Sequence, residues 1–141
     1  MAFLYPTQEA GRRFVMSGRG GPILMLNLIR LRTVADYSAD PHLAPPAPIS
    51  GRQAYDLYVA HTLPFLEASG GGLDLIADGG DWLVGPVDER WDIAMLVRQK
   101  DMETFLAFEQ NAAYLAGIGH RTAAAEDTRL LPLTVRGRGA R

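Results

Sequence analysis

The chain has 141 residues, of which 48% are hydrophobic and 21% are charged, and its formal net charge is −2. This length suits one domain with a sizeable core, and these proportions are those of globular rather than disordered proteins. The slightly acidic balance gives no large positive field, so we expect no nucleic-acid partner, and the lack of cysteine excludes disulfides, thiolate catalysis and cysteine-ligated metals.

The beginning of the chain predicts a short helix followed by a buried strand. Thr7 can cap a helix that runs through about Met16 and ends at the glycine-rich residues 17–21. Residues 22–32, PILMLNLIRLR, are apolar on both faces and are flanked by Gly and Pro. This pattern is typical of a central strand that is covered on both sides.

Residues 33–50 contain four prolines and no hydrophobic periodicity, which predicts a long loop. Loops of this length in small domains are often lids or binding loops, and a solvated insertion is an equally open alternative. A helix then runs from Ser50 to about Ser69. Helical spacing places Tyr55 and Tyr58 on the face that packs on the sheet.

The second half predicts strands around one further helix. Alternation of apolar and polar residues indicates the strands, and an acidic cap followed by helical periodicity indicates the helix. In chain order we expect strand segments at 73–77 and 82–84, a strand at 91–98, a helix from 101, a last strand at 128–135 and a frayed tail at 136–141.

This order of elements is the split βαβ order of a ferredoxin-like α+β domain, which has an antiparallel sheet with helices on one face. We therefore expect one such domain over residues 1–141. Leu24, Leu26 and Leu28 leave the other face of the sheet apolar. A second copy of the sheet is the simplest cover, so we expect a homodimer through this face.

Two polar residues of the predicted central strand are candidate ligand contacts. A buried amide without partners costs roughly 1–3 kcal/mol, so Asn27 either orients a ligand at a pocket floor or ties the strand to a loop. Arg30 lies near the strand end, where a guanidinium could clamp a carboxylate. The alternative is that Arg30 pairs with an acid such as Asp36 or Asp88 at the rim.

Other candidates lie on the predicted helices. Tyr55 and Tyr58 either line a cavity between helix and sheet or are core tyrosines whose hydroxyls reach the surface. His120 is suited to proton transfer near neutrality, and a nearby acid could orient it. The alternative is a helical turn beside an ion pair between Asp127 and Arg129.

Several classes of site find no support in the motifs. The three histidines are far apart and form no HxH or HExxH pattern, so we expect no metal. No GxGxxG, GxxxxGK[ST] or GxSxG pattern occurs in a suitable context, so we expect no cofactor. The first sixteen residues do not read as a secretory signal, and no apolar run approaches a membrane span. We expect a cytoplasmic protein that does not bind membranes.

Several stretches together resemble the DUF1330 family of the dimeric α+β barrel superfamily. They are MLNLIRLR, ADYSADP, ISGRQAYDLYVAHTLPFLEASGG, LVGPVDERWDIAMLVR and AAYLAGIGHRTAAAEDTRLLP, and they cover most of residues 25–132. The most specific parts are the GPxDExWD turn and the ending that contains HRTAA. The chain departs from the family pattern at residues 99–101 and at Asn111, near the ends of the predicted helix after residue 101.

The resemblance implies a ferredoxin-like protomer whose sheet packs on that of a partner, and it implies no assigned activity. Enzymes with this architecture include cofactor-independent monooxygenases and isomerases, which is an analogy of fold alone. The polar positions similar to the family are Asn27, Arg30, Tyr55, Tyr58, Asp88, Trp91, Asp92, Tyr114, His120 and Arg121.

Two hypotheses for function follow. The first is a cofactor-independent enzyme that performs acid–base chemistry, as an isomerase or monooxygenase would, on a small organic acid or ketone. In it His120 and Arg30 are catalytic, and the ligand contacts are Asn27, Tyr55, Tyr58, Asp88, Trp91, Tyr114 and Arg121. The second is a non-catalytic dimeric module that binds a small amphipathic ligand in the same cavity.

Overall fold

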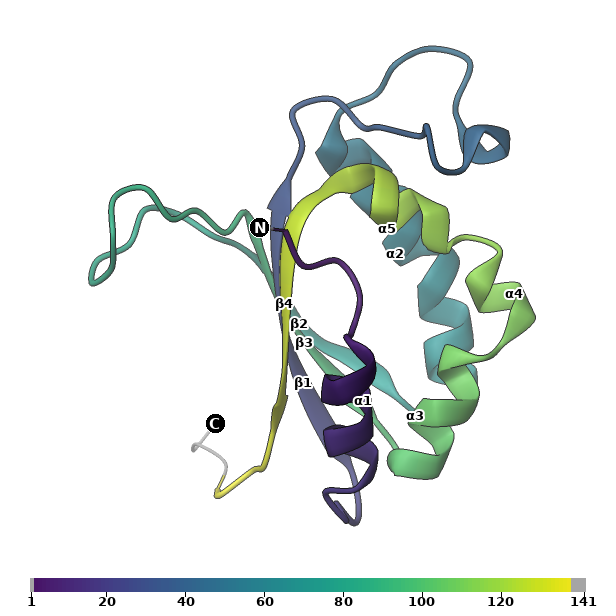
Figure 1. The fold of residues 1–141 in the computed structure, drawn as a ribbon, viewed down its shortest axis with the longest axis vertical. Coiled ribbons are helices and arrows are strands. Elements are labelled where there is room, and N and C mark those ends of the chain that lie inside the picture. The colour runs from purple at the N-terminus through teal and green to yellow at the C-terminus, as the bar shows by residue number, and fades with distance from the viewer. Residues whose placement is uncertain (1, 138–141) are drawn as a thin grey trace.

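A computed structural model describes residues 2–137 (Figure 1). Its strands are β1 (Ile23–Leu31), β2 (Gly72–Asp78), β3 (Ile93–Gln99) and β4 (Ala125–Leu133). They form an antiparallel sheet in the order β2-β3-β1-β4. The main helices are α1 (Gln8–Val15), α2 (Gly51–Ala68), α3 (Met102–Glu109), α4 (Ala112–Leu115) and α5 (Ile118–Ala124).

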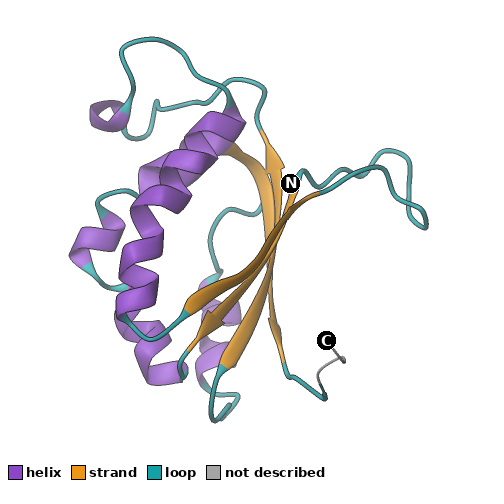
Figure 2. Ribbon diagram, turned by 180° about the vertical axis from the view of Figure 1, so that it is seen from behind, coloured by secondary structure: helices purple, strands orange, loops and turns teal. Residues whose placement is uncertain are grey.

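The helices all lie on one face of the sheet, which we call the inner face (Figures 1 and 2). The chain runs β1, α2, β2, β3, then α3 to α5, then β4, so β1 and β3 are central and β2 and β4 are at the edges. This is the ferredoxin-like arrangement, and the predicted α+β class and element order are confirmed.

Side-chain caps start the helices where the sequence predicts. The Thr7 hydroxyl accepts a hydrogen bond from the Ala10 backbone N–H at 3.1 Å and begins α1. Ser50 begins α2 in a capping box with Gln53. Asp101 caps α3 by accepting from the Thr104 backbone N–H at 2.7 Å. Each cap satisfies a backbone donor at a helix start that has no partner within its own helix.

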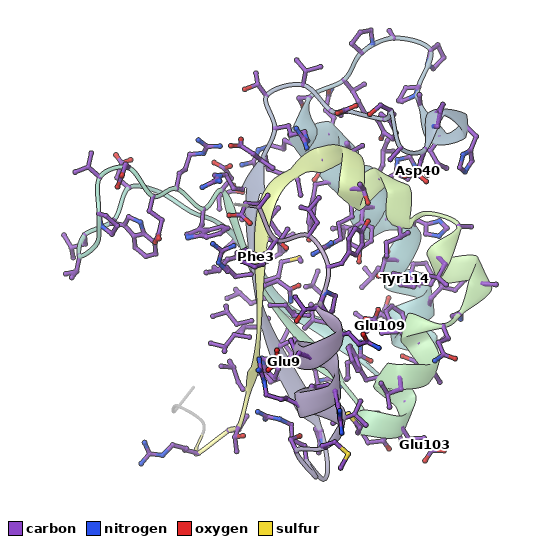
Figure 3. The ribbon with its side chains drawn as sticks, in the orientation of Figure 1. Phe3, Glu9, Asp40, Glu103, Glu109 and Tyr114 are labelled. Carbon is purple, nitrogen blue, oxygen red and sulfur yellow. The ribbon has the colours of Figure 1, made fainter. Side chains whose placement is uncertain are left out.

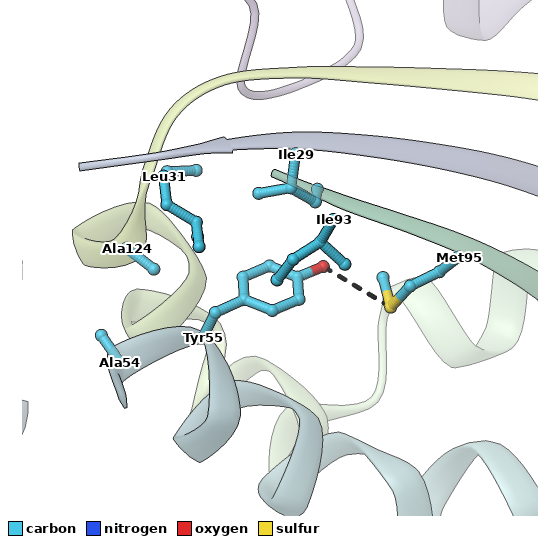
Figure 4. Close-up of a cluster of buried hydrophobic side chains, with 8 residues drawn as sticks. Ile29, Leu31, Ala54, Tyr55, Ile93, Met95 and Ala124 are labelled. Carbon is cyan, nitrogen blue, oxygen red and sulfur yellow. Dashed lines mark hydrogen bonds between the residues drawn. The ribbon is translucent and has the colours of Figure 1, made fainter. Parts of the chain in front are cut away.

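The core lies between the upper half of the sheet and α2 (Figure 4). Ile29, Ile93 and Met95 project from the inner face and pack around Tyr55 of α2. The first turn of α2 lies directly on the backbone that follows β1, since a Cβ at Gly51 would lie 2.1 Å from the Arg32 carbonyl oxygen. Only glycine permits this approach.

The sequence prediction differs from the structure in several strands. The strand predicted at 91–98 spans Ile93–Gln99. Residues 82–84 are not a strand, because they lie in a projecting loop and pair with no other strand. The last strand begins at Ala125 rather than at Thr128, so Glu126 and Asp127 lie within it. The predicted tail at 136–141 falls mostly outside the described residues.

The long loop between β1 and α2 is attached to its surroundings. Val34 and Ser50 form an isolated bridge at its base. The Asp36 backbone N–H donates to the Ala123 carbonyl at 2.9 Å, and a 3-10 turn spans Pro41–Leu43. These contacts join the loop to the end of α5. That it acts as a lid stays a prediction.

Within residues 2–137, no helix or strand lies on the face of the sheet opposite the helices, which we call the outer face (Figure 2). Strand register places Leu24, Leu26 and Leu28 of β1 on this face, opposite Leu131 and Leu133 of β4 and Leu96 of β3. No helix within residues 2–137 is long and apolar enough to cross a membrane.

Candidate functional site

A cavity of about 800 Å³ lies between the inner face and the helices. This volume is within the range of about 300–1,000 Å³ that is usual for small-molecule sites. Most of its wall is apolar. The strands contribute Met25, Met95, Val97, Leu130 and Pro132, and the helices contribute Val59, Leu63, Leu66, Phe105, Leu106, Phe108 and Ile118.

Helix α1 covers one side of the cavity without being part of the core. Ala10, Gly11 and Phe14 line the cavity, yet no residue of α1 is buried. The Phe14 ring meets the Phe105 ring of α3 edge to face, with centroids 5.5 Å apart. The segment before α1 is held more firmly, because the Thr128 backbone N–H donates to the Phe3 carbonyl at 2.9 Å.

A pair of phenols forms the most prominent polar feature of the wall. The hydroxyl oxygens of Tyr58 on α2 and Tyr114 on α4 are 3.0 Å apart. Burial raises the pKa of both groups above the ordinary value of 10.0. Both phenols are therefore neutral at physiological pH, and one of them has a proton left to donate to a third group.

Tyr55 is buried beside this pair, but its hydroxyl has a different hydrogen-bond partner. Its ring is tilted against that of Tyr58, with centroids 5.5 Å apart. Its hydroxyl donates to the Met95 sulfur at 3.9 Å, and burial raises its pKa. Sulfur is a weak acceptor, so the Tyr55 hydroxyl remains available for a stronger one.

Two charged residues of opposite sign line the cavity, Glu109 at the end of α3 and Arg121 on α5. Arg121 is half-buried, whereas Glu109 is exposed and lies at the edge of the cavity wall. In Figure 3, the side chains of Glu109 and Tyr114 point toward the same region between the helices. Loss of solvation raises the pKa of Glu109, and the positive charge of Arg121 opposes this rise. Arg121 donates to the Leu4 carbonyl at 2.6 Å and to the Thr128 hydroxyl at 3.3 Å.

Two amides complete the polar wall. Asn27 lies at the middle of β1, and its Nδ2 donates a long hydrogen bond of 3.3 Å to the Met25 carbonyl of its own strand. Gln99 at the end of β3 is only 3% exposed, and its Oε1 has no hydrogen-bond partner among the described residues. Buried amide oxygens normally have a donor, so the Gln99 Oε1 favours a ligand or water that donates.

The structure divides the predicted site residues into separate groups. Five of them line the cavity: Asn27, Tyr55, Tyr58, Tyr114 and Arg121. Their role as ligand contacts stays a prediction. The other four, Arg30, Asp88, Trp91 and His120, are not among the residues that line it.

Arg30 lies beside Trp91, and strand register places Arg30 on the outer face with Leu26 and Leu28. The Arg30 guanidinium is 5.8 Å from the Trp91 ring centroid, and that of Arg129 is 5.0 Å from it. Arg30 also pairs with Glu126 and Asp127, at 3.5 Å each. Asp88 is exposed in the projecting loop between β2 and β3. Arg30 therefore forms ion pairs, as the alternative prediction states, but with Glu126 and Asp127 and not with Asp36 or Asp88.

His120 is bound to the long loop. Its Nδ1 lies 2.7 Å from the Tyr37 hydroxyl. Burial lowers the pKa of His120, and the positive charge of His61 lowers it further. In the part of the chain that the structure describes, no group of three or more His, Cys, Asp or Glu side chains could hold a metal ion.

Sequence reasoning missed Glu109 and Gln99 as wall residues. A signal for Glu109 existed, because it occupies a position of the apolar face of α3, three residues after Leu106 and four after Phe105. An acidic residue on such a face indicates that this end of the face is in contact with water or with a polar group. Gln99 ends the apolar alternation of β3 and carries no comparable signal.

Comparison with known proteins gives relatives of the same fold. No family model and no curated protein matches the chain. A crystal structure of a protein of unknown function from Rhodopseudomonas palustris is 32% identical, with a TM-score of 0.84 over 98% of this chain and 100% of that chain. Its methylated form gives 32% identity and a TM-score of 0.86 over 99% and 98%.

A DABB family protein with a ferredoxin-like fold from Mesorhizobium loti is 11% identical, with a TM-score of 0.51 over 83% of this chain and 99% of that chain. This likeness is one of fold alone. Fold and cavity together define a ferredoxin-like α+β protein with an apolar chamber between sheet and helices. By its identity to the Rhodopseudomonas palustris protein over almost the whole length of both, the chain belongs to that protein's family.

Proposed function

We propose that the chain binds a small, largely apolar molecule with one neutral hydrogen-bonding end in the cavity. The observation that carries this proposal is the 800 Å³ apolar chamber, whose polar wall is made by Asn27, Tyr58 and Tyr114. An apolar pocket with a few convergent polar groups is the usual form of a small-molecule site. A medium-length alcohol or ketone fits this chemistry.

The charges around the cavity favour a neutral ligand over the organic acid that the sequence suggests. Arg121 already donates to Leu4 and Thr128. Two further arginines in the wall are each paired with a carboxylate, Arg13 with Glu9 at 3.1 Å and Arg129 with Asp127 at 2.8 Å. A carboxylate ligand would therefore enter a mostly apolar space in which the described arginines already use some of their N–H groups, and Glu109 would repel it.

A second candidate is acid–base catalysis on a ketone, and Glu109 is the observation that favours it. A carboxyl group with a raised pKa at a cavity wall can remove and return a proton near neutral pH. The predicted catalytic residues His120 and Arg30 lie outside the cavity wall. This candidate therefore rests on Glu109.

We also propose that the chain is a DUF1330 member and forms a homodimer through its outer face. The family motifs quoted above and the relative of unknown function support the first part. The leucine rows of the outer face, which no described helix or strand covers, support the second. An isologous pair would bury both copies of this face at once.

Displacement of the fluorescent dye Nile red tests the binding proposal. Decanol is expected to displace the dye at a concentration at least about tenfold lower than decanoate does at neutral pH, because moving a carboxylate from water into a mostly apolar space beside Glu109 weakens binding. Decanoate displacing as well as decanol would contradict the neutral-ligand proposal. Failure of both to displace, together with no calorimetric binding, would contradict the ligand site itself.

Proton exchange tests the catalytic candidate separately. In deuterated water, the wild-type protein is expected to accelerate deuterium incorporation next to the carbonyl of methyl octyl ketone, and Glu109→Gln is expected to abolish the acceleration. Nuclear magnetic resonance follows the exchange directly. Binding of the ketone with no accelerated exchange would leave the protein a binding module and exclude this candidate.

A further inference from the structure

A projecting loop between β2 and β3, residues 79–90, exposes an unusual set of apolar side chains. We call it the arm. Leu83 is 99% exposed, Val84 88% and Val87 104%, and Trp82 is 44% exposed. Single exposed apolar residues are common, whereas a contiguous cluster of this kind marks an interaction surface.

The arm leaves the sheet on the side opposite the helices. Figures 1 and 2, which are opposite views, both show it extending away from the outer face. Its base is fixed, because the Gly79 backbone N–H donates to the Asp92 carbonyl at 2.9 Å. At its tip, Gly85 packs against Trp82, where a Cβ would lie 2.6 Å from the ring. The arm thus presents its apolar residues from a folded turn.

The outer face beside the arm has the make-up of an interface. Its centre is leucine-rich, and ion pairs lie toward both ends: Arg98 with Asp74 at 3.2 Å, and Arg30 with Glu126 at 3.5 Å. An apolar centre with a polar rim is the usual anatomy of a protein interface. Strand spacing gives this four-stranded face a flat footprint of only about 500 Å², so the sheet alone makes a small interface by the standard of roughly 800 Å² of accessible surface per partner.

The geometry points to the arm as a clasp that packs its apolar side chains on a second copy of this chain. This inference rests on the dimer proposed above and adds the part of the interface that the flat sheet lacks. Packed sheets lie about 10 Å apart, whereas an arm with six residues in each direction reaches up to about 20 Å. An arm of that length crosses the space between the two packed sheets and continues along the edge of the partner's sheet. Two-fold symmetry makes each protomer both clasp and be clasped.

Sedimentation equilibrium of the full chain tests the clasp with a double variant, Leu83→Asp with Val87→Asp. Both side chains are exposed within one protomer, so the variant is expected to keep its fold by circular dichroism. Its dimer dissociation constant is expected to rise at least about a hundredfold, because each two-fold pair loses four apolar contacts and gains four charges. Met16→Asp is the matched control, since Met16 is 76% exposed on the helix side, and it is expected to dimerise like wild type.

The outcomes separate the clasp from the dimer itself. A double variant that dimerises as tightly as wild type overturns the clasp and leaves the sheet-face dimer standing. A wild-type chain that sediments as a folded monomer at micromolar concentration overturns both.

Cross-linking gives a second, independent readout. The sequence has no cysteine, so Leu83→Cys provides a unique thiol for a benzophenone photo-cross-linker. In a mixture of isotope-labelled and unlabelled protein, cross-links are expected between the arm of one copy and the partner's sheet. Links confined to the same copy would overturn the clasp even if this variant dimerises.

Discussion

The hydroxyl oxygens of Tyr58 and Tyr114 lie 3.0 Å apart on the wall of the cavity. One comes from α2 and the other from α4, so the contact joins two helices that are far apart in the chain. A pair of neutral phenols satisfies only part of its own hydrogen-bonding capacity. The remaining donor and acceptor positions are what a neutral ligand can use.

Removing one hydroxyl tests this pair. Tyr114→Phe is expected to lower the free energy of unfolding by about 1 kcal/mol, because the buried Tyr58 hydroxyl loses its partner. Decanol affinity, measured by Nile red displacement, is expected to fall about fivefold to tenfold. Tyr37→Phe makes the same chemical change outside the cavity wall and should leave the affinity unchanged. Equal affinities in wild type and both variants would remove the phenols from the site.

Asn27 gives a prediction in which stability and binding move in opposite directions. Its only described side-chain hydrogen bond is the long one to Met25, so its amide is poorly satisfied without a ligand. Asn27→Leu is expected to raise the free energy of unfolding by about 1 kcal/mol and to weaken decanol binding at least about fivefold. Urea unfolding and calorimetry measure the two effects. A large loss of stability would instead support the alternative that Asn27 ties the strand to a neighbouring segment.

Glu109 predicts a pH-dependent loss of stability. Loss of solvation raises its folded-state pKa above the ordinary value of 4.5, so the folded chain holds this proton more tightly than the unfolded chain does. Stability from this group therefore falls as pH rises from the unfolded pKa through the folded pKa. Glu109→Gln removes the effect. The melting temperature of the variant should exceed that of wild type at pH 7 and approach it below about pH 4. A difference that does not vary with pH would contradict this.

His120 is expected to serve the fold rather than the ligand, because its Nδ1 bonds to Tyr37 of the long loop. His120→Ala should cost about 1 kcal/mol of stability and leave decanol affinity unchanged. The pKa of His120 is lower in the folded chain than in the unfolded chain, so the wild-type protein loses stability as pH falls through these two pKa values. The alanine variant has no such loss, so the stability difference between wild type and His120→Ala should become smaller in acid. A tenfold weaker decanol affinity in the variant would support the ligand role that the sequence suggests.

Local signals in the sequence predict the four strands and the helices α1, α2 and α3, but not α4 and α5 as separate helices. Thr7, Ser50 and Asp101 each combine a capping side chain with a following helical period, and all three start helices. The alternation in β3 was read correctly because one face is buried. Residues 82–84 misled the prediction because Trp, Leu and Val favour strands wherever they occur, whereas a strand also needs a partner.

Only some of the residues of the candidate site were predictable from the sequence, and two residues of β1 show why. Asn27 and Arg30 are three residues apart, so strand alternation places them on opposite faces, and they cannot share one cavity. Arg30 has the same parity as Leu26 and Leu28, which were assigned to the partner-covered face. Parity could therefore have excluded Arg30 from the cavity. The position of Glu109 depends on how α3 packs on α4 and β3, and no local pattern specifies that.

Filling the cavity tests the proposed ligand site most directly. Leu130 faces the cavity from β4, is 43% exposed and lies opposite Asn27, so Leu130→Trp places a larger ring across the chamber without crowding the core. Val135→Trp is the control, because Val135 is similarly exposed, at 48%, and lies outside the cavity wall. Calorimetric titration with decanol is expected to show binding to wild type and to the control, and binding at least about tenfold weaker to Leu130→Trp. Equal decanol affinity in all three folded proteins would place the ligand elsewhere and contradict the proposed site.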